Sequence, residues 1–366
     1  MKQLIPEFPA IAISGSAGKT TTKEMLSSIL ETRWQIVKSQ KNRNIHCHTK
    51  KYAQMIKPFH QAVVLEFGMR GSVTGKLHCR FIQPNISIIT NVGSSHFGTF
   101  GNSINLTAKK KSTLIKYMNP EGVLVVNNDD KNSKLLQTTE FKGKVVTVGI
   151  NNKADYQAIN IQYVKQGMTF QVKLAEKLED FFIPSFGEHN VMNALFAIAV
   201  AHYLRFTPSE MRLGLNNYEI PEGRLNLFEL PNDLLIIDDS YNASPETAKA
   251  AINVLEELGK DKRKVVVLGS MLELGEYSTK GHLEVGTYLF QKKVDMIITY
   301  GNEAMDIGNG AYKAGFPAES IFMFNNRSQM NMYLLKTIEP NTAILIKGSG
   351  GMKMNKTANY LIKQFS

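Results

Sequence analysis

The residues with the clearest chemical signal form the segment Gly15-Ser16-Ala17-Gly18-Lys19-Thr20-Thr21 near the start of the chain. The segment follows a short apolar run and opens a helical pattern, which is the context of a phosphate-binding loop. Glycines allow backbone N–H groups to close around phosphate oxygens, and the N-terminus of the helix adds a partial positive charge. We expect the Lys19 ammonium to contact the β- and γ-phosphates, and the hydroxyl of Thr20 or Thr21 to bind Mg²⁺. The loop is shorter than the general pattern, because Ile13 stands at the position of the first glycine, and an ordinary glycine-rich turn is the alternative.

The elements that must position this loop follow an α/β pattern. Short runs rich in Val and Ile alternate with helical patterns, and these runs are nearly all apolar, as expected for parallel strands covered on both faces. Between Ala154 and Ile183 the residues alternate between apolar and polar, with Gly167 at a turn, which predicts a small antiparallel insert. The expected strands span residues 10–14, 62–67, 86–91, 122–127 and 144–148, and the expected helices span residues 19–31, 104–117 and 189–204.

A second α/β series begins after Pro221-Glu222-Gly223. Turn residues cluster over residues 216–222, where the helical periodicity stops, so this segment is the predicted linker. The pattern therefore predicts two α/β domains, residues 1–218 and residues 221–366. The expected strands of the second domain span residues 234–239, 264–269, 295–300 and 343–347, and its helices begin near residues 245, 280, 302, 328 and 352.

The composition excludes several classes of protein. The 366 residues include 43 Lys and Arg against 32 Asp and Glu, a formal net charge of +11, which suits anionic partners without selecting one. The positive charge is dispersed and no aromatic stacking pattern accompanies it, so we expect no nucleic-acid partner. No window holds the roughly 18 consecutive apolar residues of a membrane helix. Two cysteines, Cys47 and Cys79, cannot form a disulfide framework, so we expect a reducing, cytoplasmic location.

The segment 15–21 resembles the short Gly-x-x-Gly-Lys-Thr-Thr loop of the Mur ligases, and further segments resemble this family in the same order along almost the whole chain. Two of them, Asp238–Pro245 and Leu268–Gly275, most resemble the branch that adds D-alanyl-D-alanine. The resemblance implies an α/β architecture: a phosphate-loop, parallel-sheet ATP-binding domain followed by a Rossmann-like C-terminal domain. The other resembling segments are Val64–Gly68 (a strand that ends in a metal-binding glutamate), Ile89–His96, Gly187–Ala194 (a helix start that contacts adenine), Gly223-Arg224-Leu225 and Ile346–Ser349.

Members of this family join a carboxylate to an amine at the expense of ATP, through an acyl phosphate. Phosphoryl transfer between two anions needs charge neutralisation above all. The resemblance implies that Thr20, Glu66 and His96 bind Mg²⁺ and that Lys19 is a fixed cation. A solvated carboxylate at a strand end is the alternative for Glu66, and a loop histidine without a ligand role is the alternative for His96.

Many Mur ligases also carry a carbamylated lysine that helps to hold a second Mg²⁺. Counting from the loop after His96 into the helix, the matching position is Lys110, and the adjacent Lys109 and Lys111 leave the register uncertain by one residue. The acidic residue that usually follows is Ser112 here. A solvated, lysine-rich helix face is the alternative.

The resemblance places the nucleotide between two domains and gives four further residues a role. Asn190 and Asn193, at helical spacing, are expected to recognise the adenine edge. Arg224 is expected to meet the phosphates when the second domain closes, and Asp239 to hold the ribose hydroxyls. The alternatives are a helix-cap role for His189 and Asn190 and a plain turn or cap role for the pair Asp238-Asp239.

Three departures from the family pattern concern the substrate. The strand before the phosphate loop begins at about Pro9, so we expect the family's N-terminal UDP-binding domain to be missing. The family's Asn-x-Asn-Asn-x-x-Gly segment is altered over residues 42–48, and Gly350-Gly351 stands where the nearest relatives have Arg-Ser. We therefore expect small-molecule carboxylate and amine substrates without a UDP handle. The alternatives are a UDP-muramoyl peptide recognised with the help of a protein partner, and a nucleotide-binding regulatory protein without ligase chemistry.

A second metal site built from His46-Cys47-His48 and His78-Cys79 is not expected. On an extended strand, the side chains of His46 and His48 point one way and Cys47 points the other, so the three do not converge. A structural zinc site usually has four well-spaced ligands.

Overall fold

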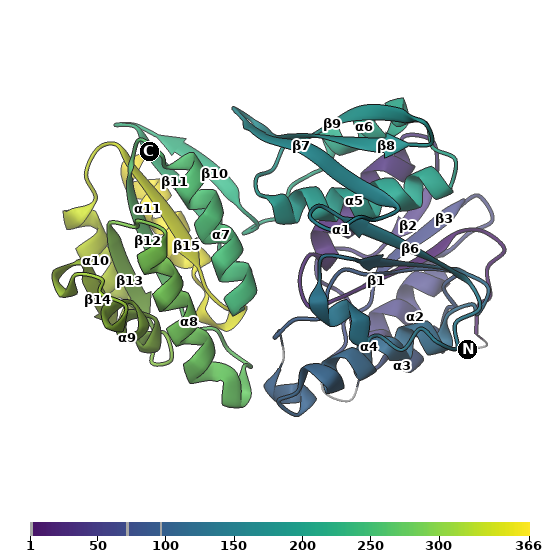
Figure 1. The fold of residues 1–366 in the computed structure, drawn as a ribbon, viewed down its shortest axis with the longest axis horizontal. Helices are drawn as coiled ribbons and strands as arrows, with labels where there is room; N and C mark the ends of the chain where they lie inside the picture. The colour runs from purple at the N-terminus through teal and green to yellow at the C-terminus, as the bar shows by residue number, and fades with distance from the viewer. Residues whose placement is uncertain (1–2, 71–72, 96) are drawn as a thin grey trace. The chain divides into compact units, whose positions relative to one another are not determined.

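The computed structural model describes residues 3–70, 73–95 and 97–366 of the chain. The chain folds into two compact units, one of residues 1–93 and 99–221 and the other of residues 94–98 and 222–366. Both contain a mainly parallel sheet covered by helices (Figure 1), which confirms the predicted α/β fold class. Within the described ranges, no helix combines the length and apolar character that crossing a lipid bilayer requires.

The sheet of the first unit has nine strands among the described residues, in the order β2-β3-β1-β4-β5-β6-β7-β8-β9. Pairing is parallel from β2 to β7, and β7, β8 and β9 pair antiparallel as the predicted insert. All residues of β1, which lies between β3 and β4, are buried, since helices cover both faces of the sheet there. The strands are β1 (Ala10–Ser14), β2 (Ile36–Lys38), β3 (Ala62–Glu66), β4 (Ile86–Ile89), β5 (Val123–Asn127), β6 (Lys144–Gly149), β7 (Tyr156–Val164), β8 (Gly167–Leu174) and β9 (Lys177–Ile183).

Helices α1 and α5 cover one face of this sheet, with α6 against them, and α2, α3 and α4 lie on the other face (Figure 1). Helix α5 is buried along most of its length because it packs on both the sheet and α1. Helix α6 begins with a capping box in which Thr207 and Glu210 satisfy each other's backbone N–H groups. The helices are α1 (Lys19–Glu31), α2 (His46–Met55), α3 (Gly75–Cys79), α4 (Ile104–Tyr117), α5 (Glu188–Tyr203) and α6 (Pro208–Asn217).

The second unit has a six-stranded sheet within the described residues, in the order β10-β11-β15-β12-β13-β14. Strand β10 pairs antiparallel with β11, and the other neighbours are parallel. Helices α7, α8 and α9 pack beside one another, and α10 packs against α11. The strands are β10 (Asn226–Leu230), β11 (Leu234–Asp239), β12 (Arg263–Gly269), β13 (Met296–Tyr300), β14 (Ile321–Phe324) and β15 (Thr342–Lys347), and the helices are α7 (Pro245–Leu258), α8 (Ser278–Gln291), α9 (Met305–Lys313), α10 (Arg327–Thr337) and α11 (Asn355–Phe365).

One local expectation was wrong. Residues 46–55 form helix α2 instead of an extended strand, so the argument that His46 and His48 point the same way does not apply. The segment is mostly polar and buries few of its residues, among them Thr49 and Tyr52. Its apolar residues are therefore too few to show the period of a helix.

Candidate active site

The loop from Gly15 to Gly18, which is the predicted phosphate loop, joins β1 to α1 and requires glycine at both of its ends. Gly15 has a φ of +146° and Gly18 a φ of +81°, which side chains rarely tolerate. A Cβ at Gly15 would lie 1.8 Å from Thr90 Oγ1, and a Cβ at Gly18 would lie 2.4 Å from Asn193 Oδ1. Neither position accepts a side chain without a rearrangement of its neighbours.

Asn91, two residues after the end of β4, fixes the loop. Its Oδ1 accepts from the backbone N–H groups of Ser16 at 3.0 Å and Ala17 at 2.9 Å. The Lys19 ammonium donates to the carbonyls of Gly15 at 2.8 Å and Ser16 at 3.4 Å, so it lies over the loop that we expect to hold phosphate. The sequence marked the segment around Asn91 by its resemblance, but it did not single out this side chain.

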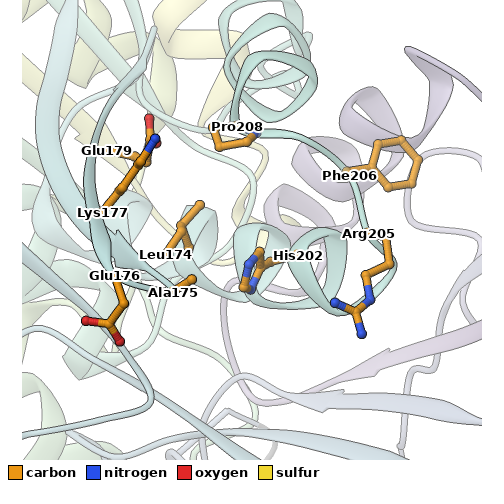
Figure 2. A pocket seen from close by; sticks show the side chains of 9 residues that line it. All are labelled: Leu174, Ala175, Glu176, Lys177, Glu179, His202, Arg205, Phe206 and Pro208. Atoms are coloured by element: carbon orange, nitrogen blue, oxygen red, sulfur yellow. The ribbon is translucent and has the colours of Figure 1, made fainter.

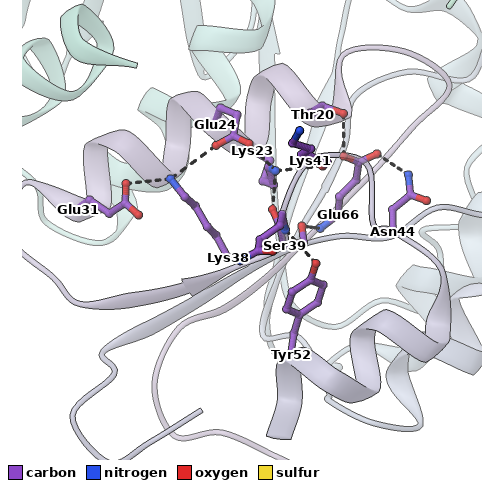
Figure 3. Close-up of polar contacts among 11 residues, drawn as sticks. Thr20, Lys23, Glu24, Glu31, Lys38, Ser39, Lys41, Asn44, Tyr52 and Glu66 are labelled. Atoms are coloured by element: carbon purple, nitrogen blue, oxygen red, sulfur yellow. Dashed lines mark hydrogen bonds and ion pairs between the residues drawn. The ribbon is translucent and has the colours of Figure 1, made fainter. Parts of the chain in front are cut away.

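Glu66 ends β3 directly beside the phosphate loop, because β3 pairs in parallel with β1 and Glu66 lies opposite Ile13. The side chain is buried, at 3% exposure, which does not fit a solvated strand end. Its Oε2 accepts from Thr20 Oγ1 at 2.8 Å, and its Oε1 accepts from Asn44 Nδ2 at 2.7 Å (Figure 3). Both donors are neutral. Asn44 lies in the segment whose sequence departs from the family pattern, yet it contacts the predicted metal ligand.

The donor set at this position fits Mg²⁺. A carboxylate and a hydroxyl are hard oxygen ligands, and Mg²⁺ is usually held by one or two carboxylates together with waters and substrate phosphates. Among the residues that the structure describes, no group of three or more His, Cys, Asp or Glu side chains could hold a metal ion, so nothing there resembles a structural zinc site. His96, the other predicted ligand, lies outside the described residues.

Helix α4 presents two adjacent lysines in different environments. The Lys110 ammonium lies 4.7 Å from the centroid of the Phe100 ring on a partly exposed side chain. Lys111 is 3% exposed. Burial lowers the pKa of the Lys111 ammonium well below its ordinary value, the charge of Lys19 lowers it further, and Asp130 raises it. Burial also lowers the pKa of Lys110, but Lys111 is the more deeply buried of the two. Carbamate formation needs an unprotonated amine, so this deeper burial favours Lys111 within the one-residue uncertainty of the sequence register.

Asn190 and Asn193 of α5 are both buried and bonded to each other, with Asn193 Nδ2 donating to Asn190 Oδ1 at 3.1 Å. Asn193 Oδ1 accepts from Thr22 Oγ1 of α1 at 3.2 Å, and Asn190 Nδ2 donates to Phe186 O at 2.9 Å. The pair thus connects α5 to the helix that begins at the phosphate loop. Recognition of adenine by these amides stays a prediction.

Arg224 belongs to the second unit and follows Gly223, whose φ is +66°. Its guanidinium carbon lies 4.0 Å from the centroid of the Tyr241 ring, and the Tyr241 N–H donates to the carbonyl of Gly223 at 3.0 Å. Stacking on an aromatic face orients a guanidinium. Its predicted contact with phosphates is untested.

Asp239 lies at the carboxyl end of β11 in the same unit. Its Oδ2 forms an ion pair with the ammonium of Lys347, which is 3% exposed and also donates to Asn242 O at 2.8 Å. Burial raises the pKa of the preceding Asp238 carboxyl, opposed by hydrogen bonds from Ser240. The predicted ribose contact of Asp239 stays a prediction.

An open pocket of about 570 Å³ lies elsewhere on the first unit, between the turn of β8 and β9 and the end of α5 (Figure 2). His202 and Arg205 line one side and Lys177 the other. Burial lowers the pKa of His202, with smaller lowering effects from Arg205 and Lys144. None of the predicted nucleotide-site residues lines this pocket, so we do not include it in the candidate active site.

A phosphate loop between a buried parallel strand and its helix, with a buried carboxylate bonded to the loop threonine, defines a phosphate-loop nucleotide-binding protein of the α/β class. Two family models match the chain: the Mur ligase middle domain over residues 13–201, and the Mur ligase, glutamate ligase domain over residues 223–350. The chain belongs to the Mur ligase family, and it is an ATP-dependent ligase that forms amide bonds.

Individual relatives agree with this assignment. The UDP-N-acetylmuramoyl-tripeptide--D-alanyl-D-alanine ligase of Bacillus subtilis (strain 168) is 33% identical over 353 residues, which cover 96% of this chain and 76% of the relative. A crystal structure of MurF from Acinetobacter baumannii matches with a TM-score of 0.87 at 29% identity, over 97% of this chain and 77% of that one. MurF ligase from Thermotoga maritima, solved in complex with ADP, has the same fold, with a TM-score of 0.82 at 23% identity over 98% of this chain and 80% of that one.

Proposed function

We propose that this chain joins the carboxylate of a UDP-muramoyl tripeptide to the amine of D-alanyl-D-alanine, with ATP and Mg²⁺. The observation that carries the ATP and Mg²⁺ part of the proposal is the 2.8 Å contact between Thr20 of the phosphate loop and the buried carboxylate of Glu66. The names of the relatives at 33% and 29% identity support this pair of substrates. The carboxylate is activated as an acyl phosphate at the expense of ATP, and the amine then displaces the phosphate and loses a proton.

The residues of the first unit supply the charge neutralisation that this reaction needs. Backbone N–H groups of the loop and the Lys19 ammonium would bind the phosphates. Thr20 and Glu66 would hold Mg²⁺, which supplies electrostatic stabilisation to a transferring phosphoryl group when it is bound. His96 is kept as a predicted ligand on the resemblance alone.

Lys111 is the residue that we propose for the carbamate, in place of Lys110. Its burial and its lowered pKa favour the neutral amine that reacts with carbon dioxide. A carbamate would convert the buried amine of Lys111 into an anion that can bind a cation. Mass spectrometry with ¹³C-bicarbonate trapping would locate the modified lysine.

The expectation of a substrate without a UDP handle rested on the position of the phosphate loop near the start of the sequence. The relatives described above are named for UDP-linked substrates, so we place the UDP-linked precursor first. A protein partner that aids recognition stays a prediction.

The test measures ADP release from ATP and Mg²⁺ with UDP-muramoyl tripeptide, with and without D-alanyl-D-alanine, and weighs the product by mass spectrometry. We expect ADP release to require both substrates and the product to be the amide. ADP release that does not depend on the amine would contradict ligase chemistry. Turnover with a UDP-free carboxylate in place of the UDP-linked one would overturn the proposed substrate.

A further inference from the structure

A lysine that the proposed reaction does not use lies completely inside the first unit. Lys23 of α1 is 0% exposed and follows Lys19 by one helical turn. Its ammonium donates to Ser39 O at 2.6 Å and Lys41 O at 3.3 Å, and it pairs with a Glu24 carboxylate oxygen at 2.5 Å. These three acceptors match the three N–H donors of an ammonium. Burying an ammonium costs free energy unless its donors are satisfied, so the Lys23 ammonium holds its three acceptors in place.

Two of the acceptors belong to residues 39–44, which we call the carboxylate loop because it contacts Glu66 at both of its ends (Figure 3). Ser39 Oγ accepts from the backbone N–H of Glu66 at 2.9 Å. Asn44 Nδ2 donates to Glu66 Oε1 at 2.7 Å. Between them, Lys41 has a φ of +48°, a conformation that a residue with a side chain adopts only when its surroundings hold it. The carbonyl of that same residue accepts from Lys23.

Helix α1 therefore reaches the carboxylate by two routes. Thr20 donates directly to Glu66 Oε2, and Lys23 acts through the carboxylate loop on the backbone and on Oε1. An apolar side chain of the same length at position 23 would fill the space, but it would leave the carbonyls of Ser39 and Lys41 without this donor. The contacts of Lys23 therefore orient the Glu66 carboxylate more than they fill the core.

We propose that Lys23 is a positioning residue that sets divalent-cation affinity in the nucleotide complex by holding the carboxylate loop around Glu66. The inference rests on the proposed function, because it takes Glu66 as a metal ligand. Partners that orient a metal-binding carboxylate typically change metal affinity by about 10–100-fold when they are removed. Nucleotide binding in the absence of metal depends on the phosphate loop and is unaffected.

The test compares Lys23→Met with Lys38→Met. Like Lys23, Lys38 forms an ion pair with Glu24, and it also pairs with Glu31. Its side chain is 36% exposed, and both of these ion pairs are with residues of α1 and not with the carboxylate loop. The readout is Mn²⁺ affinity, measured by electron paramagnetic resonance with a non-hydrolysable ATP analogue. We expect Lys23→Met to weaken Mn²⁺ binding about 10–100-fold, and Lys38→Met to leave it unchanged.

Kinetics separate positioning from general damage. In Lys23→Met the Mg²⁺ concentration for half-maximal turnover rises, kcat at saturating Mg²⁺ stays near the wild-type value, and binding of the analogue without metal does not change. Wild-type Mn²⁺ affinity in a folded Lys23→Met, or an equal loss in Lys38→Met, would overturn the inference.

If Lys23→Met does not fold, Ser39→Ala replaces it, because that change removes the acceptor for the Glu66 N–H and leaves Lys23 in place. We expect the same direction of change, and unchanged Mn²⁺ affinity in Ser39→Ala would overturn the proposed route. A wild-type chain that binds no Mn²⁺ with the analogue would instead contradict the proposed function.

Discussion

The two carboxylates predicted to face the nucleotide, Glu66 and Asp239, have opposite surroundings. Both end a parallel strand, and both are largely removed from solvent. Glu66 is held by a hydroxyl and an amide, which leave its negative charge in place, whereas Asp239 is paired with the buried ammonium of Lys347. Burying a carboxylate that is held only by neutral donors costs free energy unless a cation binds it. A carboxylate that already has a buried cationic partner serves the stability of the fold. The difference favours Glu66 over Asp239 as the proposed position for a metal ion.

The largest expected effect concerns Lys19, in the phosphate loop beside Glu66. Replacing Lys19 by Ala removes a cation from the phosphate loop, and we expect turnover to fall on the order of 10³-fold. The unfolding transition in urea should stay unchanged, because the Lys19 side chain is only half-buried and contacts the loop instead of the hydrophobic core. Steady-state ADP release and urea unfolding check this. Near-normal turnover in the folded variant would contradict the phosphate-loop assignment.

Replacing Lys347, the ion-pair partner of Asp239, should lower the free energy of unfolding. Lys347→Met leaves Asp239 without its cation, and breaking a buried pair in this way costs about 4 kcal/mol. Urea unfolding followed by circular dichroism measures the loss. The double variant Lys347→Met, Asp239→Leu should recover part of it, since both charges are then absent. A Lys347→Met protein as stable as wild type would show that the ion pair is not structural.

A buried histidine near the first site gives a pH dependence. Burial lowers the pKa of His78 from 6.5 to about 4, a hydrogen bond to Gly68 opposes the shift, and His46 adds to it. Between these two pKa values the unfolded chain binds a proton that the folded chain does not, so stability falls as the pH drops, by about 1.4 kcal/mol per unit. Urea unfolding from pH 7 to pH 4.5 tests this. His78→Gln should show a smaller slope, and an identical slope would assign the acid sensitivity to other groups.

The smallest expected effect is that of Arg224. Loss of one charged hydrogen bond to a phosphate corresponds to about tenfold in rate, and we expect Arg224→Ala to lower kcat more than it weakens nucleotide binding. Single-turnover kinetics beside calorimetric titration of ADP separate the two quantities. Weaker binding with an unchanged kcat would contradict a role that develops toward the transition state.

The sequence predicted the elements whose patterns are local. The helices at residues 19–31 and 104–117 and the strands at residues 10–14 and 234–239 have the predicted bounds, because their apolar periods lie within the elements themselves. Helix α2 was missed because most of its residues are polar.

The site was predicted in part, for a physical reason. Glu66 and the loop lysine carry signals of residue type and spacing, whereas the roles of Asn44 and Asn91 come from hydrogen bonds to residues 22 and 75 positions away in sequence. The choice between Lys110 and Lys111 depends on the rotation of α4, since adjacent helical residues face about 100° apart and one of them is buried. Sequence spacing alone carries an uncertainty of one residue at such a position.

The measurement that tests the assignment of Glu66 most directly is the affinity of the nucleotide-bound protein for Mn²⁺ in Glu66→Gln beside Asp239→Asn. Each change removes one carboxylate charge and keeps the shape of the side chain. Loss of a direct ligand should exceed the effect of an outer partner, so we expect Glu66→Gln to weaken Mn²⁺ binding by at least about 100-fold and Asp239→Asn to leave it unchanged. Wild-type Mn²⁺ affinity in a folded Glu66→Gln protein would contradict the account.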